Sequence, residues 1–220
     1  MTGVRLRLLL VNPNTNRAVT RWLADEARRV AGGRFDIVAV NADSGVAAIE
    51  TPDELDRVAS AVKAALAAHS DACAAIIGAF GDPGLAAARN RDPRPIVGLG
   101  ECGLMAAGRG GRRFAIVTLG AAMIETIASR AASLGLAGQL AAIRVLPFSI
   151  AEMIEDRDAR RDVIAAAARA SALENRVEAV LLGGAPFAGM GHALARELRI
   201  DVLDGVAACV EAAAAKIEKG

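Results

Sequence analysis

The chain has 220 residues, of which 54% are hydrophobic and 3% aromatic, and its 26 Lys and Arg residues nearly balance its 25 Asp and Glu residues. This length suits one large α/β domain or two smaller domains. The balanced charge provides no basic field for a nucleic acid, and the absence of Tyr argues against base-stacking surfaces. No apolar run reaches the roughly 18 residues that a membrane span needs, so we expect no membrane partner.

The first apolar run is followed by "VNPNTN" rather than by a small-residue cleavage pattern, so it indicates a first strand and not a signal peptide. The three cysteines, Cys73, Cys102 and Cys209, lack the spacing of a disulfide framework or a metal site. No GxGxxG or Walker A motif follows a strand, which argues against a nucleotide. We therefore expect a cytoplasmic protein without a metal site or a bound nucleotide.

Eight apolar segments alternate with helical stretches along the whole chain. They are continuous apolar runs rather than alternating ones, which is typical of parallel strands covered by helices on both faces. The pattern predicts an α/β fold with strands at residues 6–11, 35–40, 74–80, 95–100, 113–119, 141–147, 178–184 and 200–205.

Helix starts are marked by capping residues. Asn14 or Thr15 can cap a first helix that ends at the glycines of residues 32–33. Thr51–Glu54 combines an N-cap, a proline at the first helical position and a capping-box glutamate. Ser149–Glu152 repeats the capping box, which predicts the start of another long helix.

The second half of the chain repeats the spacing of the first. Asn12, at the end of the first strand, precedes Ala79 by 67 residues, and Thr118 precedes Gly184 by 66. The next strand ends 21 residues later in both halves. "IIGAFGDPG" therefore aligns with "LLGGAPFAG", and the duplication predicts two similar domains related by a pseudo-twofold axis.

A ligand of an open parallel sheet binds beyond the carboxyl ends of its strands, so two facing sheets predict a cleft between the halves. The loops there expose backbone amides and helix N-termini, which attract anions and polarised carbonyls. We expect a small carbonyl or carboxylate ligand. The candidate binding residues are Asn12, Asn14, Ala79, Phe80, Gly81, Thr118, Gly184 and Ala185.

The ionisable candidates near these loops are Asp82, Glu101 and His192. Each also has a purely structural interpretation. Asp82 lies in Gly-Asp-Pro-Gly, a natural turn; Glu101 follows a strand where it can stabilise a helix start; and His192 fits a surface loop. The asparagine and threonine candidates likewise fit as turn and cap residues, so both interpretations remain open.

The motifs "VNPNTN", "AFGDPGL", "PIVGLGE", "RFAIVT" and "LLGGAPFAGM", in this order, resemble the aspartate/glutamate/hydantoin racemase superfamily, nearest to its hydantoin and allantoin racemases. The resemblance covers essentially the whole chain. It implies two pseudo-symmetric α/β domains, no cofactor and a small ligand between them. It also implies that the final helix returns to the first domain, which gives residues 1–100 with 205–220 as one domain and 101–204 as the other. We further expect a homo-oligomer.

In these racemases two cysteines, one from each half, act as acid and base in motifs such as "ACFGDPG" and "LGCAGM". The corresponding positions here are Ala79 and Gly184, which carry no proton. The first hypothesis is a cofactor-independent racemase or isomerase acting on a hydantoin, ureide or amino-acid-like carbonyl compound. Asp82, Glu101, His192 or water would then replace the thiols. The alternatives are a non-catalytic binding protein, a decarboxylase-like lyase, or a subunit that acts only inside a larger assembly.

Overall fold

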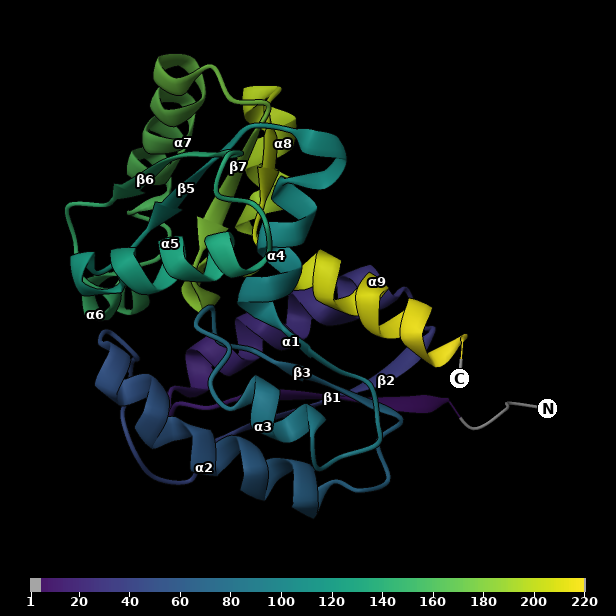
Figure 1. Cartoon of the computed structure of the whole chain (residues 1–220). Helices are drawn as coiled ribbons and strands as arrows, with labels where there is room; N and C mark the ends of the chain where they lie inside the picture. The colour runs from purple at the N-terminus through teal and green to yellow at the C-terminus, as the bar shows by residue number, and fades with distance from the viewer. Residues whose placement is uncertain (1–4, 220) are drawn as a thin grey trace.

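The computed structural model describes residues 5–219 as two four-stranded parallel sheets flanked by helices (Figure 1). The strand orders are β2-β1-β3-β4 and β6-β5-β7-β8, so the second sheet repeats the topology of the first. All eight predicted segments contain a strand, and the predicted α/β fold is confirmed. The strands are β1 (Leu6–Asn12), β2 (Phe35–Asn41), β3 (Ala74–Ile77), β4 (Ile96–Gly98), β5 (Phe114–Thr118), β6 (Leu140–Val145), β7 (Ala179–Gly183) and β8 (Asp201–Leu203).

Helices cover both faces of each sheet (Figure 1), which explains why the inner strands β3, β5 and β7 are buried along their whole length. They are α1 (Arg17–Ala31), α2 (Pro52–Ala68), α3 (Leu85–Arg89), α4 (Leu99–Ala107), α5 (Ile124–Ser133), α6 (Ile150–Glu155), α7 (Arg161–Asn175), α8 (Met190–Leu198) and α9 (Val206–Ile217). Three short 3₁₀ turns, η1 (Arg109–Gly111), η2 (Ala121–Met123) and η3 (Ala185–Phe187), lie in the second half. Between residues 5 and 219, no helix has the length and apolar character needed to cross a bilayer.

The predicted helix starts hold with two corrections. Thr51 is the N-cap of α2, and Glu54 Oε2 accepts the Thr51 backbone N–H at 3.0 Å. The cap of α1, however, is Asn16, whose side chain accepts hydrogen bonds from the first turn of the helix. Asn14 and Thr15 precede the helix because Asn14 Oδ1 accepts the Asn16 N–H at 2.9 Å and forms a turn. The helix that follows Ser149 ends at Glu155, so the predicted long helix is two helices, α6 and α7.

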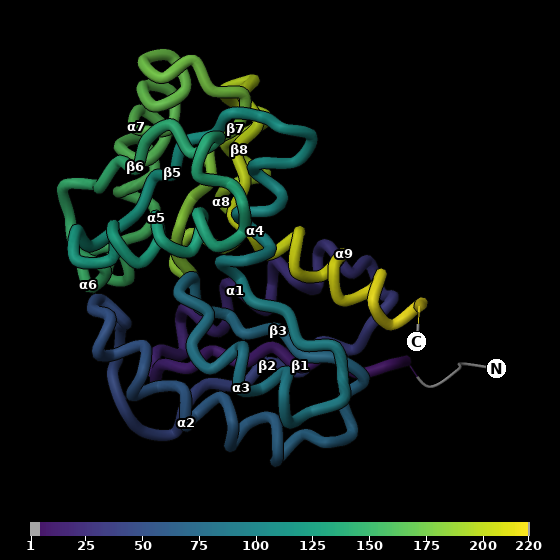
Figure 2. Tube along the Cα trace, in the orientation of Figure 1, coloured from purple at the N-terminus to yellow at the C-terminus, as the bar shows by residue number. Residues whose placement is uncertain are grey.

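The C-terminal helix α9 packs on the first sheet although it follows the last strand of the second. Cys209, Val210 and Ala213 of α9 join the same buried cluster as Leu23 of α1 and Ile76 of β3. Figures 1 and 2 show this helix, in yellow, beside the N-terminal half. Helix α4, which follows β4, contacts both α9 and β7 and so connects the two halves. The exact domain boundaries stay a prediction.

Strand β3 ends at Ile77, earlier than the predicted residue 80, because the chain turns there. Gly78 N still donates to Val11 O at 2.7 Å, and Asp82 N then donates back to Ala79 O at 3.0 Å. The segment from Ala79 to Gly81 is therefore a loop at the carboxyl end of the sheet.

Candidate functional site

A cavity of about 70 Å³ lies between the carboxyl ends of the two sheets. It has room for several water molecules or a small ring. Seven of the eight predicted binding residues line it: Asn14, Ala79, Phe80, Gly81, Thr118, Gly184 and Ala185. The eighth, Asn12, is not part of the lining. The remaining walls are apolar and include residues that the sequence did not indicate, among them Ala47–Ile49, Ile127, Ile150 and Ile154.

Asn12 supports the cavity from behind. It is fully buried, and its Nδ2 lies 2.9 Å from Asn14 Oδ1 and 3.0 Å from Thr20 Oγ1. Asn14 Oδ1 also accepts the Asn16 N–H, so its acceptor capacity is used within the loop. The two donors to Asn14 Oδ1, Asn12 Nδ2 and the Asn16 N–H, fix the orientation of the Asn14 amide. Asn14 Nδ2 is then the group that can donate a hydrogen bond to a ligand.

Thr118 offers the opposite chemistry from the second half. Its hydroxyl donates its hydrogen to Gly183 O at 2.7 Å, across the β5–β7 pairing. A hydroxyl has one hydrogen, so Thr118 Oγ1 retains only acceptor capacity toward the cavity. Asn14 and Thr118 therefore give the cavity one side-chain donor and one side-chain acceptor, from different halves of the chain.

Small residues at the strand ends allow the two halves to pack closely together. Gly183, at the end of β7, leaves space for the Phe80 ring: a Cβ there would lie 3.0 Å from Phe80 Cε1 and 2.9 Å from Ile116 Cγ2. Ala79 and Gly184, the neighbours of Phe80 and Gly183 in the chain, both belong to the cavity lining. No Asp, Glu, His, Cys, Lys or Arg side chain belongs to the described part of the lining.

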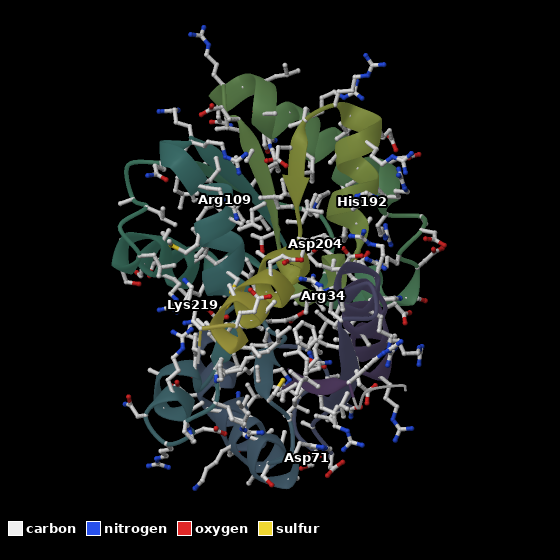
Figure 3. The ribbon with its side chains drawn as sticks, turned by 90° about the vertical axis from the view of Figure 1, so that its right-hand side faces the viewer. Arg34, Asp71, Arg109, His192, Asp204 and Lys219 are labelled. Atoms are coloured by element: carbon white, nitrogen blue, oxygen red, sulfur yellow. The ribbon has the colours of Figure 1, made fainter. Side chains whose placement is uncertain are left out.

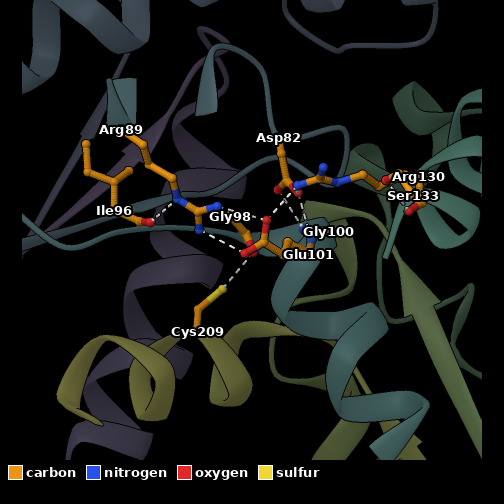
Figure 4. Close-up of polar contacts among 9 residues, drawn as sticks. All are labelled: Asp82, Arg89, Ile96, Gly98, Gly100, Glu101, Arg130, Ser133 and Cys209. Carbon is orange, nitrogen blue, oxygen red and sulfur yellow. Dashed lines mark hydrogen bonds and ion pairs between the residues drawn. The ribbon is translucent and has the colours of Figure 1, made fainter. Parts of the chain in front are cut away.

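Asp82 lies directly after the lining residue Gly81 but is directed toward α4. It is 7% exposed, and its carboxylate accepts the backbone N–H groups of Gly100 at 2.8 Å and Glu101 at 2.7 Å (Figure 4). Its φ of 50° is left-handed, a conformation that aspartate tolerates better than most residues. Burial raises the pKa of Asp82 to about 6, although the two amides and Arg130 favour the charged form. Asp82 therefore stabilises the start of α4 as well as belonging to the turn in which the sequence placed it.

Glu101 lies in the first turn of α4 and is held by two arginines. Arg89 donates two hydrogen bonds to its carboxylate, at 2.8 and 3.0 Å, and Arg130 donates one at 2.7 Å. The hydrogen bonds from Arg89 hold the pKa of Glu101 below its usual value. Glu101 is outside the cavity lining, and its ion pairs connect α3, α4 and α5.

His192 is exposed on α8 and does not line the cavity (Figure 3). The structure therefore separates the three ionisable candidates, Asp82, Glu101 and His192, from the lining. Throughout residues 5–219, no three His, Cys, Asp or Glu side chains gather as a metal site would require.

The sequence patterns did not point to a second buried aspartate, Asp204. Asp204, which follows β8, is 5% exposed and accepts backbone N–H groups from Gly189 at 2.7 Å, Gly191 at 3.1 Å and Val206 at 3.2 Å. Burial raises its pKa to about 6, and the nearby Glu26 charge adds to the effect. The signal in the sequence was "DG" after an apolar strand, which also fits an ordinary turn.

Comparison with known proteins points to one family. The profile of the Asp/Glu/Hydantoin racemase family matches residues 8–213. A hydantoin racemase of Pseudomonas sp. (strain NS671) is 29% identical over 217 residues, which cover 98% of this chain and 87% of that protein. The allantoin racemase of Klebsiella pneumoniae superposes with a TM-score of 0.93 at 28% identity, covering 98% of this chain and 89% of that one. The allantoin racemase of Pseudomonas fluorescens gives a TM-score of 0.90 at 27% identity, with 98% and 92% covered.

Proposed function

Because the chain belongs to the Asp/Glu/hydantoin racemase family, we propose that it binds a hydantoin or related cyclic ureide in the cavity and exchanges the proton on the carbon next to the ligand's carbonyl. Its relatives are named racemases, which are isomerases. The observation that carries the choice of ligand is the pairing of Asn14 Nδ2, a donor, with Thr118 Oγ1, an acceptor, in an otherwise uncharged cavity.

The uncharged lining favours a neutral ligand over an amino acid. A free amino acid would bring a carboxylate and an ammonium group into a cavity whose described walls hold no opposite charge, and such unpaired charges are costly to bury. A hydantoin or ureide instead carries neutral C=O and N–H groups. Asn14 Nδ2 can donate to the carbonyl, and Thr118 Oγ1 can accept from the ring N–H.

The proposed chemistry is proton removal from the α-carbon, with the electron pair moving onto the carbonyl oxygen to form an enolate. The amide of Asn14 would stabilise the oxygen as negative charge develops there. Return of a proton to the opposite face would complete a racemisation. Since no described lining side chain can carry the proton, water in the cavity would make the direct transfer.

Asp82 is the group that we propose as the final proton acceptor and donor. It follows Gly81 of the lining, and its pKa of about 6 suits proton transfer near neutral pH. Its carboxylate is held by the amides of Gly100 and Glu101. The proton would therefore pass between Asp82 and the ligand through water rather than by direct contact.

A second candidate function is binding without turnover. It is favoured by Ala79 and Gly184, which line the cavity at the positions where the resemblance places two cysteines. A protein of this kind would keep the donor and acceptor of the cavity and would have lost the proton carriers.

Deuterium incorporation distinguishes the two functions. A 5-substituted hydantoin and allantoin would be incubated with the protein in heavy water, and loss of the α-proton signal would be followed by NMR against buffer alone, with affinity measured by calorimetry. Exchange faster than buffer, lost in Asp82→Asn but kept in Glu211→Gln, supports the isomerase and the role of Asp82. Glu211 is a matched carboxylate in an exposed ion pair with Arg34.

The other outcomes are equally informative. Accelerated exchange that persists in Asp82→Asn keeps the isomerase and removes Asp82 from the mechanism. Binding without accelerated exchange establishes the binding protein. Failure of both ligands to bind at millimolar concentration overturns the proposed ligand class.

A further inference from the structure

The peptide bond between Ala188 and Gly189 is held from both of its ends. Arg157 Nη2 donates a hydrogen bond to the Ala188 carbonyl oxygen, and Asp204 Oδ2 accepts the Gly189 N–H at 2.7 Å. A cation and an anion therefore bind the negative and the positive end, respectively, of one peptide dipole. Gly189 has a φ of +81°, which L side chains rarely adopt, so the backbone turns sharply at this point.

The Ala188–Gly189 peptide lies at the end of the segment that forms one wall of the cavity. Gly184, Ala185 and Pro186 line the cavity, and η3 ends only two residues before Gly189. Within this segment, Phe187 N donates to Gly184 O and Ala188 N donates to Ala185 O, both at 3.1 Å. Because of these two short-range hydrogen bonds, the position of the Ala188–Gly189 peptide fixes the position of the cavity wall.

Arg157 also contacts the other half of the molecule. Its guanidinium carbon lies 4.5 Å from the ring centroid of Trp22, on α1. Trp22 is one helical turn from Val19, which lines the cavity. Arg157 forms no ion pair among the described residues, and its side-chain hydrogen bond there goes to the Ala188 carbonyl oxygen. Figure 3 shows Asp204 near the middle of the molecule, close to the start of α9.

We infer that Arg157 and Asp204 are positioning residues that set the cavity wall 184–186 against α1 by holding the Ala188–Gly189 peptide between them. The expected effect on ligand affinity rests on the proposed function. The expected ordering of residues 184–189 rests on the structure alone. Neither residue lines the cavity, so both act through the peptide.

The test uses Arg157→Ala, Arg157→Lys and Asp204→Asn, with Arg160→Ala as the matched control. Arg160 lies three residues along the chain, stacks on Phe148 at 5.2 Å and touches neither Trp22 nor Ala188. Trp22 is the only tryptophan, so its fluorescence reports on this contact without interference. Hydrogen exchange of the 185–191 amides would be measured in the ligand-free protein, and affinity for the hydantoin by calorimetry.

Arg157→Ala should shift the Trp22 emission, speed exchange at 185–191 and weaken hydantoin binding about tenfold, as expected for one lost hydrogen bond to a charged group. Arg157→Lys should retain the cation over Trp22 and recover part of the affinity. Asp204→Asn should speed the same amides. Arg160→Ala should leave all three readouts unchanged.

Wild-type exchange and affinity in Arg157→Ala would overturn the inference, as would an equal effect of Arg160→Ala. A global loss of stability is separated by comparing exchange at 185–191 with exchange in β1 and β5. If the wild-type protein does not bind the hydantoin, the proposed function fails and exchange in the ligand-free variants still decides the inference.

Discussion

Asp82 and Asp204 are buried aspartates that stabilise helix starts in reciprocal ways in the two halves. Asp82 follows β3 and accepts amides at the start of α4, which follows the neighbouring strand β4. Asp204 follows β8 and accepts amides at the start of α8, which follows the neighbouring strand β7. Each carboxylate thus connects two loops at the carboxyl end of its sheet, next to the cavity walls.

The first prediction concerns the pH dependence of stability. Asp82 has a pKa raised to about 6, so between about pH 4 and pH 6 the folded chain holds a proton that the unfolded chain releases. Its contribution to the unfolding free energy is greatest below about pH 4 and is lost as the pH rises through 6. The difference between wild type and Asp82→Asn should fall by on the order of 3 kcal/mol from pH 4 to pH 7, measured by urea unfolding.

Asp92 provides a control of opposite sign for this experiment. Hydrogen bonds from Arg94 lower its pKa, so its contribution is present above its unfolded pKa and is lost as the pH falls. The difference between wild type and Asp92→Asn should therefore rise with pH in the acid range. A difference for Asp82→Asn that stays constant from pH 4 to pH 7 would contradict the raised pKa.

The second prediction restores ionisable groups to the cavity walls. Ala79→Cys with Gly184→Cys should speed α-proton exchange of a hydantoin by roughly 100-fold or more, because each wall then carries a group that can transfer a proton directly. Gly184 has an extended backbone, with φ 162°, and a Cβ there would lie 3.3 Å from the Phe187 ring, so a small shift accommodates it. The double serine variant is the control, and equal rates for both variants would argue against the ligand pose.

The third prediction tests the loop that carries Phe80. A Cβ at Gly100 would lie 1.9 Å from the Phe80 carbonyl oxygen, a backbone atom that cannot move independently. Gly100→Ala should lower the unfolding free energy by about 1–3 kcal/mol and weaken hydantoin binding, because Phe80 lines the cavity. Gly138→Ala, where nothing lies within 4 Å, should change neither measurement.

The fourth prediction concerns the acceptor in the cavity. Thr118→Val keeps the side-chain shape but removes the hydroxyl that donates to Gly183 O and can accept from a ligand N–H. Calorimetry should show hydantoin binding weakened by about tenfold. Thr15→Val is a control because Thr15 bonds Val46 O and does not line the cavity. Unchanged affinity in Thr118→Val would place the ligand elsewhere in the cavity.

The fold followed from features that are local in the chain. Continuous apolar runs, capping residues and the repeated spacing from Asn12 to Ala79 and from Thr118 to Gly184 predicted eight parallel strands in two similar halves. Apolar runs and capping residues depend only on neighbouring residues, and the repeat is visible from spacing alone, so these features can be recognised without a structure. The predicted homo-oligomer, the absence of a cofactor and the cytoplasmic location stay predictions.

The sequence did not predict the direction in which the polar side chains point. The sequence placed Asn12 and Asn14 together, but only packing decided that Asn12 is buried behind the loop while Asn14 faces the cavity. It placed Asp82 beside the cavity, whereas the unpaired amides of a helix 18 residues further along attract its carboxylate away.

The sequence by itself determined the two-sheet architecture and the bare strand ends at Ala79 and Gly184, because apolar periodicity and residue identity are properties of the chain. Only the tertiary structure decided which groups meet the ligand. Contacts such as Phe80 with Gly183, or Arg157 and Asp204 on one peptide bond, join segments far apart in sequence and exist only after both sheets have packed.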